Sequence, residues 1–101
     1  MVYGLPKEAV EEIHSVLSGY SQIEEAILYG SRAKETARKG SDIDLVLKGK
    51  DLDLHLLNQI CLELDDLLLP YRIDLSLFKS IENPDLIDHI NRVGKIFYKK
   101  Q

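Results

Sequence analysis

Residues 23–47 read IEEAILYGSRAKETARKGSDIDLVL, two apolar segments joined by a polar connection. The segments 23–29 and 43–47 are short, rich in aliphatic residues and bounded by glycine, a pattern typical of strands. The connection, residues 30–42, is too short for a full helical crossover between parallel strands, although it has room for one or two helical turns. The two predicted strands can therefore pair directly.

Helical periodicity flanks this pair of strands. A first helix is expected between Pro6 and Gly19, because apolar residues recur there at three- and four-residue spacing and glycine can close a helix. Asp51 or Asp53 can cap a second helix, which we expect Pro70 to end. The predicted apolar stripe of this second helix consists of Leu57, Ile60, Cys61, Leu64, Leu67 and Leu68.

The C-terminal third predicts another strand, a helix and an edge strand. Residues 71–78, YRIDLSLF, alternate between apolar and polar. The Asn-Pro-Asp sequence at 83–85 is a strong start signal for a last helix that Gly94 can close, and residues 96–98 can add a short strand. We predict a single α+β domain over residues 1–101, a two-layer arrangement with a small mixed β-sheet and helices packed mainly on one face.

Composition limits the class of protein. The chain has 101 residues, 45% of them hydrophobic, and a formal net charge of −4, which fits one compact globular domain and makes a nucleic acid partner unexpected. A lone Cys61 excludes an internal disulfide and a multi-cysteine zinc site. Without an apolar run of about 18 residues or a signal-peptide pattern, we expect a cytoplasmic protein with no membrane contact.

Three aspartates stand out as candidate metal ligands. Asp42 and Asp44 are two residues apart, so they project from the same face of the second strand. Asp74 interrupts the apolar third strand and would complete a three-carboxylate site if these strands are neighbours. Carboxylates this close repel one another unless a cation lies between them, and oxygen ligands suit Mg²⁺ or Mn²⁺. The open alternative is that these aspartates are solvent-facing strand ends or caps.

A candidate phosphate site precedes the first two aspartates. Gly30 lets backbone amides approach a ligand, N–H groups at a helix start attract phosphate, and Ser31 adds a hydroxyl donor. Residues 32–39 are basic. A plain turn and a solvated loop are the alternatives for these two features taken alone. Together with paired carboxylates, they are typical of a site for a divalent metal and substrate phosphates.

The motifs also resemble a known family. GSRAK at residues 30–34, followed by GSDIDL at residues 40–45, resembles the signature of minimal nucleotidyltransferases (MNT), which belong to the DNA polymerase β nucleotidyltransferase superfamily. The resemblance covers nearly the whole chain and includes the third acid, Asp74. Glu35 is a departure, because the family usually has glycine there. The resemblance implies a polymerase β-like nucleotidyltransferase fold.

The same resemblance implies an activity, a metal and a partner. It implies transfer of a nucleoside monophosphate, AMP from ATP, to a hydroxyl of a partner protein. Asp42 and Asp44 would hold two Mg²⁺ ions, with Mn²⁺ as a substitute, and Asp74 would join one ion and orient the acceptor; these three are the implied catalytic residues. The implied partner is a helical HEPN-domain protein, the toxin of a toxin–antitoxin pair. The implied nucleotide contacts are Gly30, Ser31, Arg32, Lys34 and Ser41.

Two other functions stay open from the sequence. The first is a non-catalytic antitoxin that acts by binding alone, which Glu35 leaves open. The second is a small-molecule nucleotidyltransferase that uses a second chain to bind its substrate. The three histidines, His14, His55 and His89, fall within predicted helices, and we interpret them as surface or packing residues.

Overall fold

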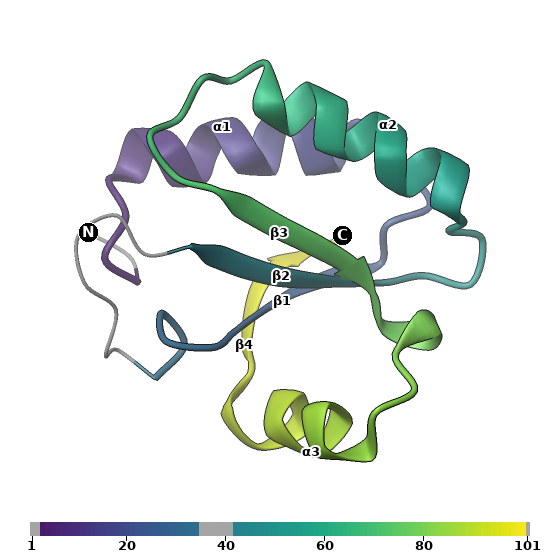
Figure 1. Cartoon of the computed structure of the whole chain (residues 1–101). Coiled ribbons are helices and arrows are strands. Elements are labelled where there is room, and N and C mark those ends of the chain that lie inside the picture. Colours follow the sequence, from purple (N-terminus) through teal and green to yellow (C-terminus); the bar gives the residue numbers. More distant parts are fainter. Residues whose placement is uncertain (1–2, 35–41, 101) are drawn as a thin grey trace.

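The computed structural model describes residues 3–34 and 42–100 of the chain (Figure 1). Its elements follow the order α1 (Lys7–Ser18), β1 (Glu25–Tyr29), β2 (Ile43–Lys48), α2 (Leu54–Asp65), β3 (Ile73–Leu77), the 3₁₀ helix η1 (Phe78–Ser80), α3 (Pro84–Val93) and β4 (Lys95–Lys99). The predicted α+β class and the predicted order of helices and strands are confirmed.

The strands form one mixed sheet in the order β3-β2-β1-β4. Strand β1 pairs antiparallel with β2 and with β4, whereas β2 pairs parallel with β3. The direct pairing of the first two strands is confirmed. Because parallel neighbours need a long crossover connection, α2 runs between β2 and β3 across one face of the sheet.

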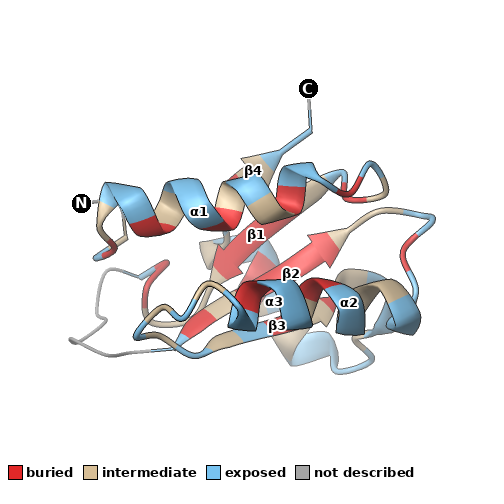
Figure 2. Cartoon of the chain, turned by 90° about the horizontal axis from the view of Figure 1, so that it is seen from above, coloured by how far each residue is buried: buried red, intermediate tan, exposed pale blue. Residues whose placement is uncertain are grey.

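Helices cover both faces of this sheet. Helices α1 and α2 lie on one face, as predicted for most of the helices, and α3 lies on the other (Figure 1). Alternate residues of β2 serve the two faces: Leu45 packs in the main core with the helices α1 and α2, while Val46 packs with Ile27 and with Ile90 of α3. Strands β1 and β2 carry the most continuous buried surface (Figure 2). Asp44 therefore shares its face with α3.

Helix α2 shows where the sequence-based boundaries were right and where they were wrong. Its start agrees with prediction, because the Asp53 carboxylate accepts a hydrogen bond from the Leu56 N–H at 2.8 Å. Its end comes at Asp65, before the predicted Pro70. The N–H groups of residues 67 and 68 bond to carbonyls three residues back, and Leu68 then adopts a positive φ of 55°. The helix has therefore ended before Leu68, which is 88% exposed rather than part of the core.

The last helix also begins where its start signal indicates. The Asn83 side chain accepts a hydrogen bond from the Asp85 N–H at 2.9 Å, and Pro84 occupies the first helical turn. Strand β3 is shorter at both ends than the predicted strand over 71–78, since Phe78 already belongs to η1. Within residues 3–34 and 42–100, no helix is both long and apolar enough to cross a membrane.

Candidate functional site

Three polar side chains form a row across the sheet on the face of α3. Tyr29 at the end of β1 lies opposite Asp44 of β2, and Asp44 lies opposite Asp74 of β3. Residues opposite one another in neighbouring strands project to the same face. The condition on which the sequence-based site depended, that the second and third strands are neighbours, is therefore met. Asp42 precedes β2 and is exposed.

Asp44 lies in an unfavourable electrostatic environment for a carboxylate. Burial raises the pKa of Asp44, the negative charges of Asp74 and Asp42 raise it further, and His89 acts in the opposite direction. The ionised form of Asp44 is thus penalised by both desolvation and like charge. A bound cation would remove this penalty.

The donor set fits a hard divalent cation by its chemistry. The predicted ligands offer carboxylate oxygens, which suit Mg²⁺ or Mn²⁺ better than zinc. In the described part of the chain, however, no group of three or more histidine, cysteine, aspartate or glutamate side chains lies close enough together to hold a metal ion. The structure therefore pairs Asp44 with Asp74 in neighbouring strands, and the charge of Asp42 acts on Asp44. The three carboxylates do not form a closed metal site in the described residues.

The Gly30 turn lies directly against this row. Gly30 has a positive φ of 77°, a conformation that suits glycine. A Cβ atom at Gly30 would also lie 2.5 Å from Oδ2 of Asp44. The Gly30 carbonyl accepts a hydrogen bond from the Lys34 N–H at 3.2 Å, so residues 31–34 form a helical turn. Ser31, at the start of this turn, is half-buried.

The two basic residues of the motif occupy different environments. Arg32 is only 2% exposed; its Nη1 donates a hydrogen bond to the Tyr3 carbonyl at 3.1 Å, and its guanidinium carbon lies 5.1 Å from the centre of the Tyr71 ring. Arg32 thus ties the segment before α1 to the segment before β3. Lys34 is exposed. Their contacts with nucleotide remain predictions, and Ser41 and Glu35 lie outside the described residues.

His89 is at the site although the sequence interpretation treated it as a surface or packing residue. The Gly30 N–H donates a hydrogen bond to Nε2 of His89 at 3.3 Å. A signal for an inward-facing position was available, because His89 lies three residues after Leu86 and four before Val93, and this spacing puts them on one side of α3. His14, in contrast, shares a hydrogen bond with the Phe97 carbonyl of β4 and packs against the Phe97 ring.

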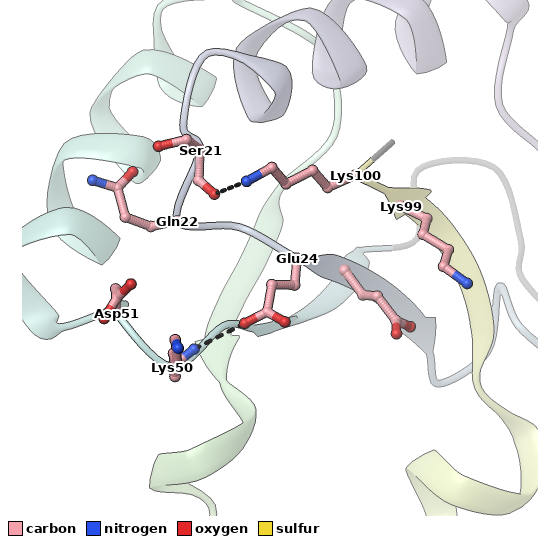
Figure 3. A pocket seen from close by; sticks show the side chains of 8 residues that line it. Ser21, Gln22, Glu24, Lys50, Asp51, Lys99 and Lys100 are labelled. Atoms are coloured by element: carbon pink, nitrogen blue, oxygen red, sulfur yellow. Dashed lines mark hydrogen bonds between the residues drawn. The ribbon is translucent and has the colours of Figure 1, made fainter.

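A separate polar pocket of about 460 Å³ lies at the far end of β1 from Tyr29 (Figure 3). Lys100 Nζ donates to the Ser21 carbonyl at 3.0 Å, and the Lys50 N–H donates to the Glu24 carboxylate at 3.1 Å. None of the predicted site residues lines this pocket. The candidate site is therefore the Asp44–Asp74 row with its glycine turn, and not this pocket.

The structure thus has a glycine turn against paired strand carboxylates on a small mixed sheet. The chain belongs to the family described as "Polymerase beta, Nucleotidyltransferase", whose model matches residues 11–101. The predicted superfamily is confirmed. No curated protein matches the sequence.

Solved structures share the fold at low sequence identity. A toxin–antitoxin complex with AMP-PNP matches with a TM-score of 0.72 and 23% identity over 91% of this chain and 74% of that chain. An MntA–HepT toxin–antitoxin complex matches with a TM-score of 0.68 and 20% identity over 94% and 74%. A complex of the tri-AMPylated Shewanella oneidensis HEPN toxin with its MNT antitoxin gives 0.67 and 19% over 93% and 72%.

Proposed function

We propose that this chain transfers AMP from ATP to a hydroxyl group of a helical HEPN-domain protein and so acts as the antitoxin of a toxin–antitoxin pair. The observation that carries the proposal is the contact between the Gly30 turn and Asp44. It puts a candidate phosphate-binding turn against the carboxylate row, which suits a nucleoside triphosphate bound through a divalent metal. Membership of the nucleotidyltransferase family supports the same reaction class.

Different side chains of this protein would bind the metal and the phosphates in such a reaction. Asp42, Asp44 and Asp74 would hold Mg²⁺, which when bound lowers the pKa of an acceptor hydroxyl and neutralises departing pyrophosphate. Ser31 and the N–H groups of the turn after Gly30 would donate hydrogen bonds to the phosphate oxygens. Exposed Lys34 would add positive charge beside them.

The proposed step is an in-line displacement at the α-phosphorus of ATP. The acceptor hydroxyl oxygen forms a bond to this phosphorus while the bond from phosphorus to the bridging oxygen of the β-phosphate breaks, and pyrophosphate leaves. The hydroxyl proton passes to a base, for which Asp74 is the candidate because it is the exposed carboxylate of the row. Asp44, half-buried between its two neighbours, is better suited to a fixed ligand role.

We propose a protein acceptor because solved structures with this fold include complexes of an antitoxin with its toxin. Among the solved structures that share the fold, one is a toxin–antitoxin complex with AMP-PNP and another holds a tri-AMPylated HEPN toxin with an MNT antitoxin. Enzymes gain much of their rate by holding reactants in register. An acceptor side chain carried on a docked partner would meet that need.

The decisive experiment measures transfer of AMP from ATP to the co-purified partner protein. We expect incubation with ATP and Mg²⁺ to add AMP to one hydroxyl side chain of the partner, seen as a mass increase in the intact protein and located by peptide mass spectrometry. Asp44→Asn is the matched inactive control. Partner that stays unmodified while remaining bound and inhibited would instead favour an antitoxin that acts by binding alone. Efficient adenylylation of a small alcohol in its place would identify a small-molecule enzyme.

A further inference from the structure

The Gly30 turn is held from the α3 side by a residue outside the family motif. Gly30 N–H donates to Nε2 of His89 at 3.3 Å. The His89 ring meets the Tyr29 ring edge to face, with 6.3 Å between ring centres and 80° between ring planes. Helix α3 packs against β1, so His89 contacts the last residue of that strand and the first residue of the turn together.

This hydrogen bond gives the His89 ring the role of acceptor. An imidazole nitrogen accepts a hydrogen bond through its lone pair, so this contact uses Nε2 of His89 as an acceptor. The Gly30 N–H is therefore satisfied within the protein and is not a free donor for phosphate.

The same contact restrains the peptide unit at which the chain changes direction. Gly30 has a positive φ of 77°, and glycine populates several backbone conformations almost equally well. A hydrogen bond to its N–H fixes the plane of the Tyr29–Gly30 peptide, from which the orientation of the following turn is built. Because Oδ2 of Asp44 lies against Gly30, a change in this peptide would move the turn relative to the carboxylate.

We propose that His89 is a positioning residue that holds the phosphate-binding turn against Asp44 through the Gly30 N–H. This inference rests on the proposed nucleotide-binding function of the turn. It predicts that the acceptor atom at position 89, and not the charge or the aromatic ring, decides nucleotide affinity. Glutamine can present an acceptor oxygen close to the place of Nε2, whereas leucine fills similar space and offers none.

The test compares His89→Leu, His89→Gln and the control His55→Leu, which changes an exposed histidine of α2. Binding of AMP-PNP with Mg²⁺ is measured by calorimetry, and the Gly30 amide is followed by ¹H–¹⁵N NMR without nucleotide. We expect His89→Leu to weaken AMP-PNP binding about 5- to 10-fold, the range of one lost hydrogen bond, and to shift the Gly30 amide upfield. His89→Gln should recover most of the affinity, and His55→Leu should bind like wild type.

Kinetics separate positioning from general packing. In the transfer reaction, loss of turn position should raise KM for ATP while leaving kcat within a few-fold, and His89→Gln should restore KM. Equal losses in His89→Leu and His89→Gln, or wild-type affinity with an unchanged Gly30 amide in His89→Leu, would overturn the inference. If the Gly30 amide shifts but wild-type protein binds no AMP-PNP, the proposed function fails, and the positioning role for a nucleotide fails with it.

Discussion

Oδ2 of Asp44 lies so close to Gly30 that a Cβ atom at residue 30 would be only 2.5 Å from it. The turn and the carboxylate can approach this closely only because residue 30 has no side chain. Gly30 meets two requirements at once, a positive φ of 77° and this close approach.

Gly30→Ala should destabilise the fold by about 1–3 kcal/mol, the usual cost of a non-glycine residue in a strained backbone region together with steric overlap. It should also weaken AMP-PNP binding, because the turn must move away from Asp44. Urea unfolding and calorimetry measure the two effects. Part of the cost should disappear in an Asp44→Ala background, where the opposing carboxylate is gone; fully additive costs in the double mutant would show that the contact contributes nothing.

Asp44→Asn should stabilise the metal-free protein at neutral pH. Burial and the charges of Asp74 and Asp42 raise the pKa of Asp44 above its usual 3.8, so ionised Asp44 opposes folding. A raised folded-state pKa gives a stability contribution that is present at low pH and lost as pH rises through that pKa. The advantage of Asp44→Asn over wild type should therefore be largest near neutral pH and shrink as pH falls toward 4.

Urea titrations in EDTA at several pH values measure this difference, with Asp51→Asn in an exposed loop as the control. Subtracting wild type from mutant at each pH removes the contribution of the other carboxylates. An Asp44→Asn variant that is less stable than wild type at neutral pH would contradict the electrostatic description of the row.

Asp42→Asn and Asp44→Asn should each lower AMP transfer about a hundredfold or more. A neutral amide binds Mg²⁺ poorly, and charge stabilisation by a metal contributes several kcal/mol to such reactions, at one factor of ten for each 1.4 kcal/mol. Millimolar Mg²⁺ should raise the unfolding temperature of wild type and not that of Asp44→Asn. Near-normal turnover by both variants would remove these aspartates from the metal site.

Ser31→Ala should weaken AMP-PNP binding by about 1–2 kcal/mol, the scale of one hydrogen bond to a charged group. Backbone N–H groups of the turn remain, so transfer should fall and not vanish. Ser18→Ala is the control, because the Ser18 hydroxyl donates a hydrogen bond to the Ser15 carbonyl and lies on the exposed side of α1, away from the turn. Unchanged affinity for AMP-PNP would favour a plain turn at this position.

Tyr20→Phe should cost about 1 kcal/mol, because the Tyr20 hydroxyl donates to Glu63 of α2 from the segment after α1. Burial raises the pKa of Tyr20 above 10.0, and Glu63 adds to the shift. The stability that this raised pKa provides is present below pH 10 and is lost as pH rises through the folded-state pKa. Wild type should thus lose stability at alkaline pH relative to Tyr20→Phe, measured by urea unfolding between pH 8 and about 11.

Sequence periodicity predicted the elements well because burial on one face imposes a strict spacing. Asp44 and Asp74 could be singled out in the same way, since each interrupts an apolar strand. The pairing of β2 with β3, which brings them side by side, was only a condition at that point, and the structure meets it. The left-handed Leu68 could not be predicted, because leucine has no preference for that conformation and only the local turn decides it. The burial of Arg32 against Tyr3 and Tyr71 depends on three segments far apart in the chain.

His89 shows the same limit within the site. Its helical position indicated an inward side chain, but the partner that it meets, the Gly30 N–H, comes from 59 residues earlier. No spacing rule within α3 contains that information. The position of Asp42 relative to Asp44 and Asp74 is likewise outside what the strand pattern can give, because Asp42 lies before β2 and is not held in register by the sheet.

The register of the parallel pair β2 and β3 determines both the burial of the core and the alignment of Asp74 with Asp44. Side chains along a strand alternate between the two faces, so a slip of β3 by one residue would turn Asp74 toward α2 and expose Leu75. Leu75 and Leu77 are buried on the α2 face, and such a slip would forfeit their burial. The apolar core therefore selects the one alignment of β3 that presents Asp74 to Asp44, and any chain that folds to full stability has assembled its carboxylate row in the same event.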